Sequence, residues 1–119
     1  MKSVLVVEDD VTVAKVLEIS LSRAGFLFTL ARDYASAKAA LAKDWAAVIL
    51  DINLPGGSGL NLLRYLRQEL RKTTPVIILS GLKQDKMLAE AQLLGAQAYI
   101  TKPFSPKVLL EVLRKYVAS

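Results

Sequence analysis

The sequence predicts an α/β protein with a doubly wound parallel sheet, covered by helices on both faces. Five short apolar runs alternate with longer amphipathic segments along the 119 residues. The runs are short, and most of them are rich in Val and Ile, which favours strands buried on both faces. Right-handed crossovers leave few other topologies for such an alternation, so a three-layer sandwich is expected.

The elements follow one another in a regular order. We expect strands at residues 4–7, 26–30, 46–50, 76–79 and 98–101. We expect helices at residues 11–24, 33–43, 59–72 and 85–94, and a last helix after residue 105. Asp33 and Ser105 are suitable N-caps, while Gly25 and Gly95 are suitable stops. The last helix is expected to bury the face formed by Val108, Leu109, Val112, Leu113 and Tyr116.

The length and composition indicate a single globular domain over residues 1–119. A chain of this size buries roughly two-thirds of its unfolded surface, which is enough for a core without disulfides. There is no Cys and no His. This excludes disulfide frameworks, thiol nucleophiles, and catalysis or metal binding by imidazole. Any metal must therefore bind through oxygen ligands, as Mg²⁺, Ca²⁺ and Mn²⁺ do.

The charge and the hydropathy suggest where the chain acts. No apolar run approaches the length of about 18 residues that a membrane span needs, so we expect no membrane segment and a cytoplasmic protein. The net charge of +5 invites a nucleic-acid interpretation. A solvated basic surface is the better interpretation, and Arg64, Arg67 and Arg71 on the third helix are included in it. We predict no sequence-specific nucleic-acid binding, because every helix is needed to cover the sheet.

Polar side chains follow the ends of several predicted strands. In an open parallel sheet these ends meet at one edge, which is where ligands bind. The side chains delivered there are Glu8, Asp9 and Asp10 after the first strand, Asp51 and Asn53 after the third, Ser80 after the fourth, and Thr101 and Lys102 after the fifth. The acids after the first strand would also suit a helix N-terminus, but capping does not explain acids from two strands facing a lysine.

The acidic cluster predicts a site for a divalent cation. Crowded carboxylates repel one another, and some stay protonated unless a cation lies among them. Glu8, Asp9 and Asp51 carry three negative charges, which one Mg²⁺ or Mn²⁺ ion together with Lys102 would balance. A pocket neutralised in this way is suited to accept a phosphoryl group.

Four segments in order resemble a response-regulator receiver domain of the chemotaxis type. They read VLVVEDD at 4–10, VILDINLPG at 48–56, ILSG at 78–81 and YITKPF at 99–104. The resemblance covers essentially the whole chain and implies a flavodoxin-like sheet of order 2-1-3-4-5. It also implies a phosphoprotein of a two-component regulatory system, which accepts a phosphoryl group and passes a signal on.

The resemblance assigns roles at the predicted site. It implies that Asp51 is the phosphoacceptor, that Asp9 binds Mg²⁺ directly, and that Glu8 acts beside it through water. Asn53 would give its main-chain carbonyl to the metal. Two further residues would meet the phosphoryl group, namely Ser80 through its hydroxyl and Lys102 through its charge. The bond before Pro103 is often cis in the family, and Gly81 stands where the family often has Ala.

The resemblance also implies a conformational switch and a donor. Tyr99 matches the switch aromatic, and its movement with Ser80 would remodel the face at residues 85–116, formed by the fourth helix, fifth strand and last helix. A histidine kinase or phosphotransfer protein would supply the phosphoryl group. The chain would not be an enzyme beyond its own phosphorylation and dephosphorylation. Gln97 and Ala98 replace acids that one group of DNA-binding regulators carries, so a monomer or weak dimer is expected.

Two other functions use similar residues. A Mg²⁺-dependent phosphatase of the haloacid-dehalogenase type also uses an Asp at a strand end, but it needs a second Asp two positions later as general acid, and Asn53 stands there. A flavodoxin-like cofactor binder is disfavoured because the acids of the first loop would repel a flavin phosphate. The glycines at 56–59 are interpreted as a turn, and Trp45 as packing between the second helix and the third strand.

Overall fold

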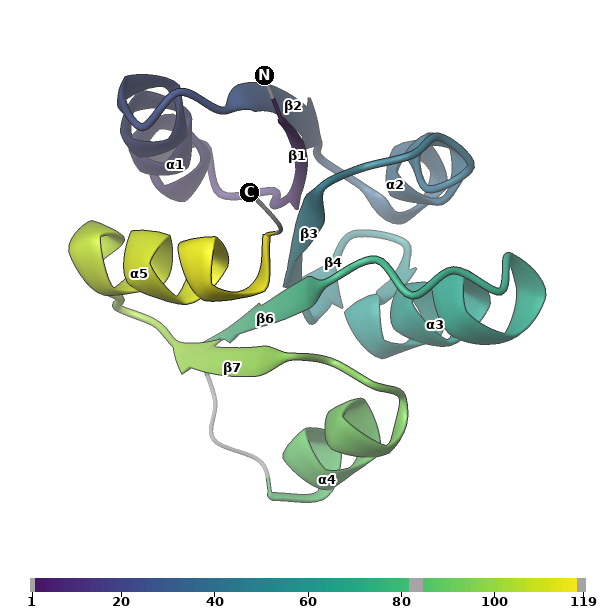
Figure 1. The fold of residues 1–119 in the computed structure, drawn as a ribbon. Helices are drawn as coiled ribbons and strands as arrows, with labels where there is room; N and C mark the ends of the chain where they lie inside the picture. The colour runs from purple at the N-terminus through teal and green to yellow at the C-terminus, as the bar shows by residue number, and fades with distance from the viewer. Residues whose placement is uncertain (1, 82–84, 118–119) are drawn as a thin grey trace.

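The structure is a computed structural model, which describes residues 2–81 and 85–117. Its centre, within these residues, is a five-stranded parallel sheet (Figure 1). The strands lie in the order β2 (Leu27–Ala31), β1 (Ser3–Val7), β3 (Ala47–Asp51), β6 (Val76–Ser80) and β7 (Ala98–Thr101). This confirms the predicted order 2-1-3-4-5, with β6 and β7 as the fourth and fifth strands. The second strand is at the edge and begins one residue later than predicted.

Helices connect the strands, and four of them begin at a side-chain cap. They are α1 (Val11–Arg23), α2 (Tyr34–Ala40), α3 (Gly59–Arg64), which continues as the π-helical turn η1 (Tyr65–Glu69), α4 (Asp85–Leu93) and α5 (Pro106–Tyr116). The caps are Asp10, Asp33, Ser58 and Ser105, whose side chains accept main-chain N–H bonds. Such caps satisfy N–H groups that have no partner inside the helix.

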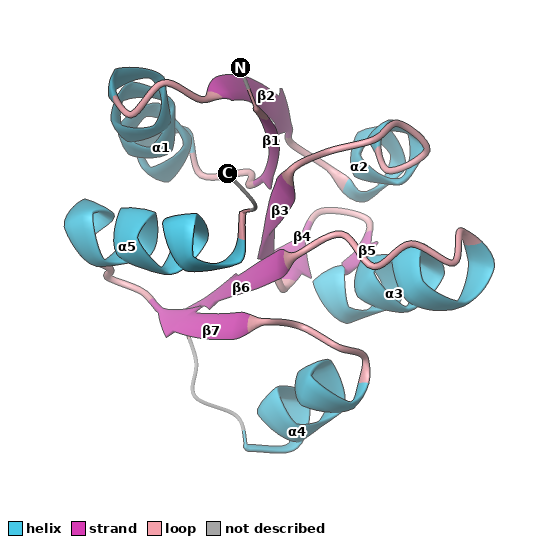
Figure 2. Cartoon of the chain, viewed as in Figure 1, coloured by secondary structure: helices cyan, strands magenta, loops and turns pink. Residues whose placement is uncertain are grey.

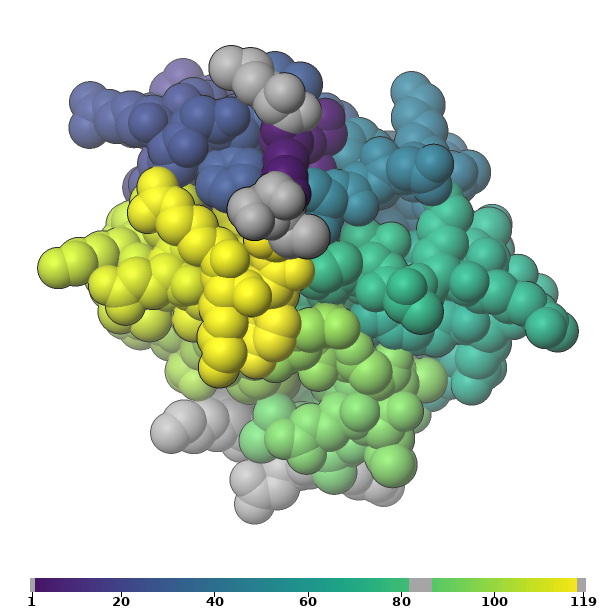
Figure 3. Space-filling view, viewed as in Figure 1, coloured from purple at the N-terminus to yellow at the C-terminus, as the bar shows by residue number. Residues whose placement is uncertain are grey.

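The helices form layers on both faces of the sheet, as Figure 2 shows. One apolar cluster packs β1, β3 and β6 against α1 and α5, and includes Leu17, Leu21, Leu109 and Leu113. The other packs the opposite face of the sheet against α2, α3 and α4. Side chains fill the spaces between the ribbons (Figure 3). None of the helices in the described residues is both long and apolar enough to span a bilayer.

The loop predicted after β3 contains a small antiparallel hairpin. Its strands are β4 (Asn53–Leu54) and β5 (Gly57–Ser58), and Gly56 adopts φ +91° in the turn between them. A left-handed backbone of this kind favours glycine. Gly56 is therefore in a turn, as predicted, whereas Gly57 belongs to β5 and Gly59 begins α3. Trp45 also matches its prediction, since it packs on the core and its Nε1 donates to the carbonyl of Ala40 at 2.8 Å.

The second helix is shorter than predicted, and the side chain of Lys72 binds the carbonyls that follow it. It ends at Ala40 rather than near residue 43. The Nζ of Lys72 donates to the carbonyls of Leu41, Ala42 and Lys43, at 3.3, 2.9 and 2.9 Å. A cation at a helix C-terminus is favourable, and here it replaces another helical turn.

The third helix also ends earlier than the predicted residue 72. Its last regular turn is π-helical, and the N–H of Lys72 donates to the carbonyl of Leu66. Arg71 has a left-handed backbone with φ +54°, which ends the helix. Pro75 follows, and proline disfavours helical backbone in the residue before it.

The structure contradicts two predictions, namely that Val108 is buried and that Arg67 lies on a solvated surface. Val108 is 49% exposed, because the buried stripe of α5 passes through Leu109 and Leu113 instead. Arg67 is not part of a solvated basic face, since its guanidinium donates to the carbonyls of Leu94, Lys72 and Gly95 at 2.9 Å each. Burial lowers its pKa. Arg67 therefore joins the end of η1 to the segment after α4.

Candidate functional site

The predicted site residues lie at one edge of the sheet. Glu8 and Asp9 follow β1, Asp51 ends β3, and Ser80 ends β6. Lys102 follows β7, and its main-chain N–H donates to the carbonyl of Ser80 at 2.8 Å. Because the strands are parallel and in close register, their carboxyl ends bring these side chains together, as predicted.

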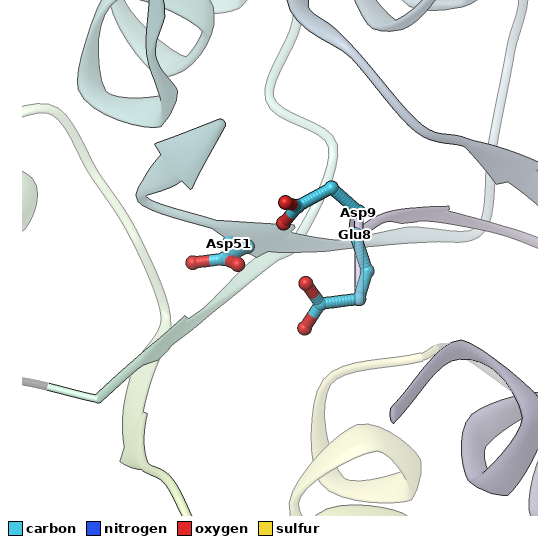
Figure 4. Close-up of side chains that lie close together, drawn as sticks. All are labelled: Glu8, Asp9 and Asp51. Carbon is cyan, nitrogen blue, oxygen red and sulfur yellow. The ribbon is translucent and has the colours of Figure 1, made fainter. Parts of the chain in front are cut away.

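Three carboxylates converge at this edge, as Figure 4 shows. Glu8, Asp9 and Asp51 each place one oxygen within 4.8 Å of the others. Glu8 is fully buried and Asp51 is 4% exposed, whereas Asp9 is open to solvent. Asp10 is not a member of this cluster, because its carboxylate caps α1 through the N–H groups of Thr12 and Val13.

Lys102 contacts both buried carboxylates. Its Nζ lies 2.5 Å from Glu8 Oε1 and 3.1 Å from Asp51 Oδ2. Burial lowers the pKa of Lys102, but its interactions with Glu8 and Asp51 outweigh burial, so its pKa is raised and the ammonium is kept. The Lys102–Pro103 bond is cis.

Glu8 holds a proton more readily than an ordinary glutamate. Burial and the neighbouring Asp51 carboxyl raise its pKa to about 7, although Lys102 and the N–H of Asp10 act in the opposite direction. Within the described residues, Glu8 Oε1 contacts the ammonium without a hydrogen bond of regular geometry. One lysine is therefore too little positive charge for this carboxylate pair.

The donor set fits a hard divalent cation. It consists of carboxylate oxygens from Glu8, Asp9 and Asp51, which is the ligand type that Mg²⁺ and Mn²⁺ prefer. Burial and the Asp51 carboxyl raise the pKa of Glu8, and a cation bound at the cluster would favour the charged form of this carboxylate. An open hollow of about 460 Å³ adjoins Asp9 and is lined further by residues 52–55, 57 and 58, so the cluster is accessible from solvent.

The local backbone orients Asp51. Its Oδ1 accepts the main-chain N–H of Asn53 at 3.0 Å. Gly59 donates its N–H to the carbonyl of Ile52 at 2.6 Å. A Cβ at Gly59 would lie 2.4 Å from the carbonyl oxygen of Asp51, so only glycine fits here. The role of Gly59 was missed in the sequence, because a glycine cluster indicates a turn but does not show which glycine contacts the strand.

Ser80 and Tyr99 occupy neighbouring strands on the same face of the sheet. Ser80 is buried and pairs in register with Thr101. Tyr99 is half-buried and packs on the apolar cluster shared with α4. Side chains alternate along a strand, and Val76 and Ile78 of β6 belong to that same cluster. Ser80 therefore faces the side on which Tyr99 and α4 lie.

The comparisons with known proteins agree with this geometry. Residues 4–114 match the response regulator receiver domain family. The chain is 36% identical over 111 residues to the phosphate regulon transcriptional regulatory protein PhoB of Escherichia coli, covering 92% of this chain and 48% of that protein. The chain thus spans about half the length of the curated relatives it matches.

Solved structures show the same fold. A receiver domain protein from Methanospirillum hungatei superposes with a TM-score of 0.93 at 26% identity, covering 98% of this chain and 94% of that one. The receiver domain of the sensor histidine kinase PA1611 from Pseudomonas aeruginosa, with magnesium coordinated in its active-site cleft, gives a TM-score of 0.87 at 27% identity and covers 99% and 98%.

The chain belongs to the response regulator receiver domain family. It is a regulatory domain of two-component signalling, and the comparisons do not support the phosphatase alternative. Its acidic cluster of Glu8, Asp9 and Asp51 lies at the carboxyl edge of the sheet and could hold a metal ion.

Proposed function

We propose that this chain accepts a phosphoryl group on Asp51 from the phosphohistidine of a histidine kinase or phosphotransfer protein. The observation that carries the proposal is the environment of the Asp51 carboxylate. One oxygen is held by the N–H of Asn53, and the other lies 3.1 Å from the Lys102 ammonium. The nucleophile is thereby oriented and has positive charge beside it.

The transfer is an in-line displacement. A carboxylate oxygen of Asp51 attacks phosphorus while the bond to the histidine nitrogen breaks, and the electron pair returns to the imidazole. The product is an acyl phosphate on Asp51. Lys102 moves its contact from the carboxylate to the phosphoryl oxygens, and the Ser80 hydroxyl at the neighbouring strand end donates to one of them. The chain would catalyse only this reaction and the hydrolysis of its own acyl phosphate.

The carboxylates of Glu8, Asp9 and Asp51 and the main-chain carbonyl of Asn53 would hold one Mg²⁺ or Mn²⁺ ion. Such an ion supplies positive charge for the phosphoryl oxygens. The buried Glu8 contributes by its charge, and the exposed Asp9 contributes from the solvent side. These assignments agree with the close approach of the three carboxylates.

The signal would leave through α4, β7 and α5, at residues 85–116. Ser80 and Tyr99 lie on the side of the sheet that packs against α4, so a shift of Ser80 toward the phosphoryl group would let Tyr99 move. Binding to a specific nucleic-acid sequence is not expected of this chain alone, and a cytoplasmic location stays a prediction. One curated relative is named as a transcriptional regulator, so transcription is one candidate output.

Labelling by acetyl phosphate tests the acceptor. With Mg²⁺ present, intact mass should show one added phosphoryl group, and Asp51→Asn should abolish it. Asp10→Asn is the matched control, because Asp10 carries the same charge nearby but caps α1, and it should keep the label. Full labelling of Asp51→Asn would overturn the proposal, and slow multiple turnover of small phosphate esters would restore the phosphatase alternative.

A further inference from the structure

The outer edge of β2 presents unpaired main-chain groups. β2 is the terminal strand of the sheet, between α1 and α2 (Figure 1). The N–H of Leu27 donates to the main-chain carbonyl of Lys2, and the carbonyl of Ala31 accepts from the main-chain N–H of Glu8. In a parallel pair such bonds alternate, so the main-chain groups of Phe28 and Leu30 point away from β1. No strand in residues 2–81 or 85–117 pairs with that side.

This edge lacks several of the features that prevent an edge strand from pairing with another chain. Exposed edges commonly carry charged residues, proline or a bulge. Residues 26–31 read FLFTLA, without charge or proline. β2 pairs with β1 in unbroken register over five residues, so there is no bulge in it. Leu27 on this strand is 48% exposed.

An apolar hollow lies beside the same edge. It has a volume of about 230 Å³ and is lined by Val11 and Ala14 of α1 and by Phe28 and Leu30 of β2, with the charged residues Lys15, Glu18 and Arg32 at its rim. Val11 is 66% exposed. Phe28 and Leu30 both belong to the face of the sheet covered by α1, so α1 leaves part of the apolar surface of β2 uncovered.

We propose that a second copy of this chain pairs with β2 in antiparallel orientation, about a two-fold axis at Thr29. In this register Phe28 lies opposite the partner's Leu30, and Thr29 lies opposite the partner's Thr29. The residues whose main-chain groups point outward are then the ones that meet. Each Phe28–Leu30 pair exchanges two N–H to carbonyl bonds, so the sheet continues from one copy into the other.

A second copy suits this edge because the strand is complementary to itself. The two-fold axis places Phe28 and Leu30 of both copies on the same face, where each phenylalanine ring packs against the leucine opposite it and both lose exposed apolar surface. The two hollows then adjoin across the axis, and their apolar lining residues Val11, Ala14, Phe28 and Leu30 lie beside those of the partner copy. The absence of charge on β2 means that no like charges oppose one another.

A cysteine scan of β2 tests both the pairing and its register. The chain contains no cysteine, so Thr29→Cys and Leu27→Cys each introduce a single thiol at an exposed position of the same strand face. Opposed residues of a non-hydrogen-bonded antiparallel pair are about 4.5 Å apart, which allows a disulfide. Leu27 is remote from the partner's Leu27 in the proposed register. Mild oxidation should cross-link Thr29→Cys at least about tenfold faster than Leu27→Cys.

A charge variant tests the unmodified interface. Thr29→Lys should raise the dimer dissociation constant at least about tenfold in sedimentation experiments, because it opposes two charges at the axis. Thr73→Lys changes another exposed threonine, so it is the matched control and should leave the dimer dissociation constant unchanged. Circular dichroism and Asp51 labelling check that Thr29→Lys folds. Equal cross-linking of the two cysteine variants, equal effects of the two lysine variants, or a protein that stays monomeric throughout would overturn the proposal.

Discussion

Lys102 holds its ammonium 2.5 Å from the carboxylate of Glu8, which is completely buried. The two residues come from opposite ends of the chain and meet at the carboxyl edge of the sheet. Despite this contact, the pKa of Glu8 is raised to about 7, chiefly by burial and by Asp51. The site is therefore short of positive charge before any cation binds, and this gives it a distinct pH dependence.

Without a divalent cation, the free energy of unfolding should fall as pH rises from about 4.5 to about 7. In this window the unfolded chain has lost the Glu8 proton, because its pKa there is 4.5, while the folded chain keeps it. The unfolded state binds fewer protons, so raising the pH favours it, by at most on the order of 3 kcal/mol over the window. Urea unfolding at several pH values measures this.

Glu8→Gln is the matched variant for this pH dependence. It preserves the shape of the side chain and removes the titration, so the fall in stability should largely disappear. Saturating Mg²⁺ should have a similar effect on the native chain, because a cation favours the charged form of Glu8. An unchanged slope in Glu8→Gln would show that another group is responsible.

Asp9 and Asp10 are adjacent acids with different expected effects on metal binding. Asp9→Ala should weaken Mg²⁺ binding about tenfold or more, because its carboxylate is part of the three-residue cluster. Asp10→Ala should change binding much less and instead cost about 1 kcal/mol of stability, since it removes the cap of α1. Calorimetric titration and thermal unfolding separate the two effects, and equal losses of affinity would contradict the assignment.

Two glycines near the site should differ in their tolerance of a methyl group. Gly59→Ala should cost about 1–3 kcal/mol of stability and slow the labelling of Asp51, because the added Cβ would collide with the main chain of Asp51 and Ile52. Gly81→Ala is the matched control, since nothing lies within 4 Å of its Cβ position. Denaturant unfolding and acetyl phosphate labelling measure both, and similar behaviour of the two variants would argue against the close approach at Gly59.

The fold could be predicted because its signals are local. Each strand is a short apolar run with a polar residue at its end, and topology then brings those ends to one edge. Glu8, Asp51 and Lys102 could be placed together in this way. Two features could not be predicted. Arg67 binds carbonyls near α4, about 27 residues further along the chain. Lys72 binds the carbonyl of Leu41 at the end of α2, which lies a similar number of residues earlier in the chain. Contacts of this range leave no periodic pattern in the sequence.

The proposed switch should connect Asp51 to Tyr99 and α4 through Ser80. Beryllofluoride with Mg²⁺ mimics the phosphoryl group, and its addition should change the amide exchange or NMR shifts of Tyr99 and α4 as well as those around Asp51. The reason is that Ser80 and Tyr99 lie on the face of the sheet that packs against α4, so a movement of Ser80 changes the space next to the tyrosine ring. Ser80→Ala should bind beryllofluoride but transmit less of the change to Tyr99. The strand β2 provides an internal reference, because it lies at the opposite edge of the sheet from β7 and should respond least. If only residues near Asp51 change and the signals of Tyr99 and α4 stay the same, then Tyr99 and α4 do not carry the signal.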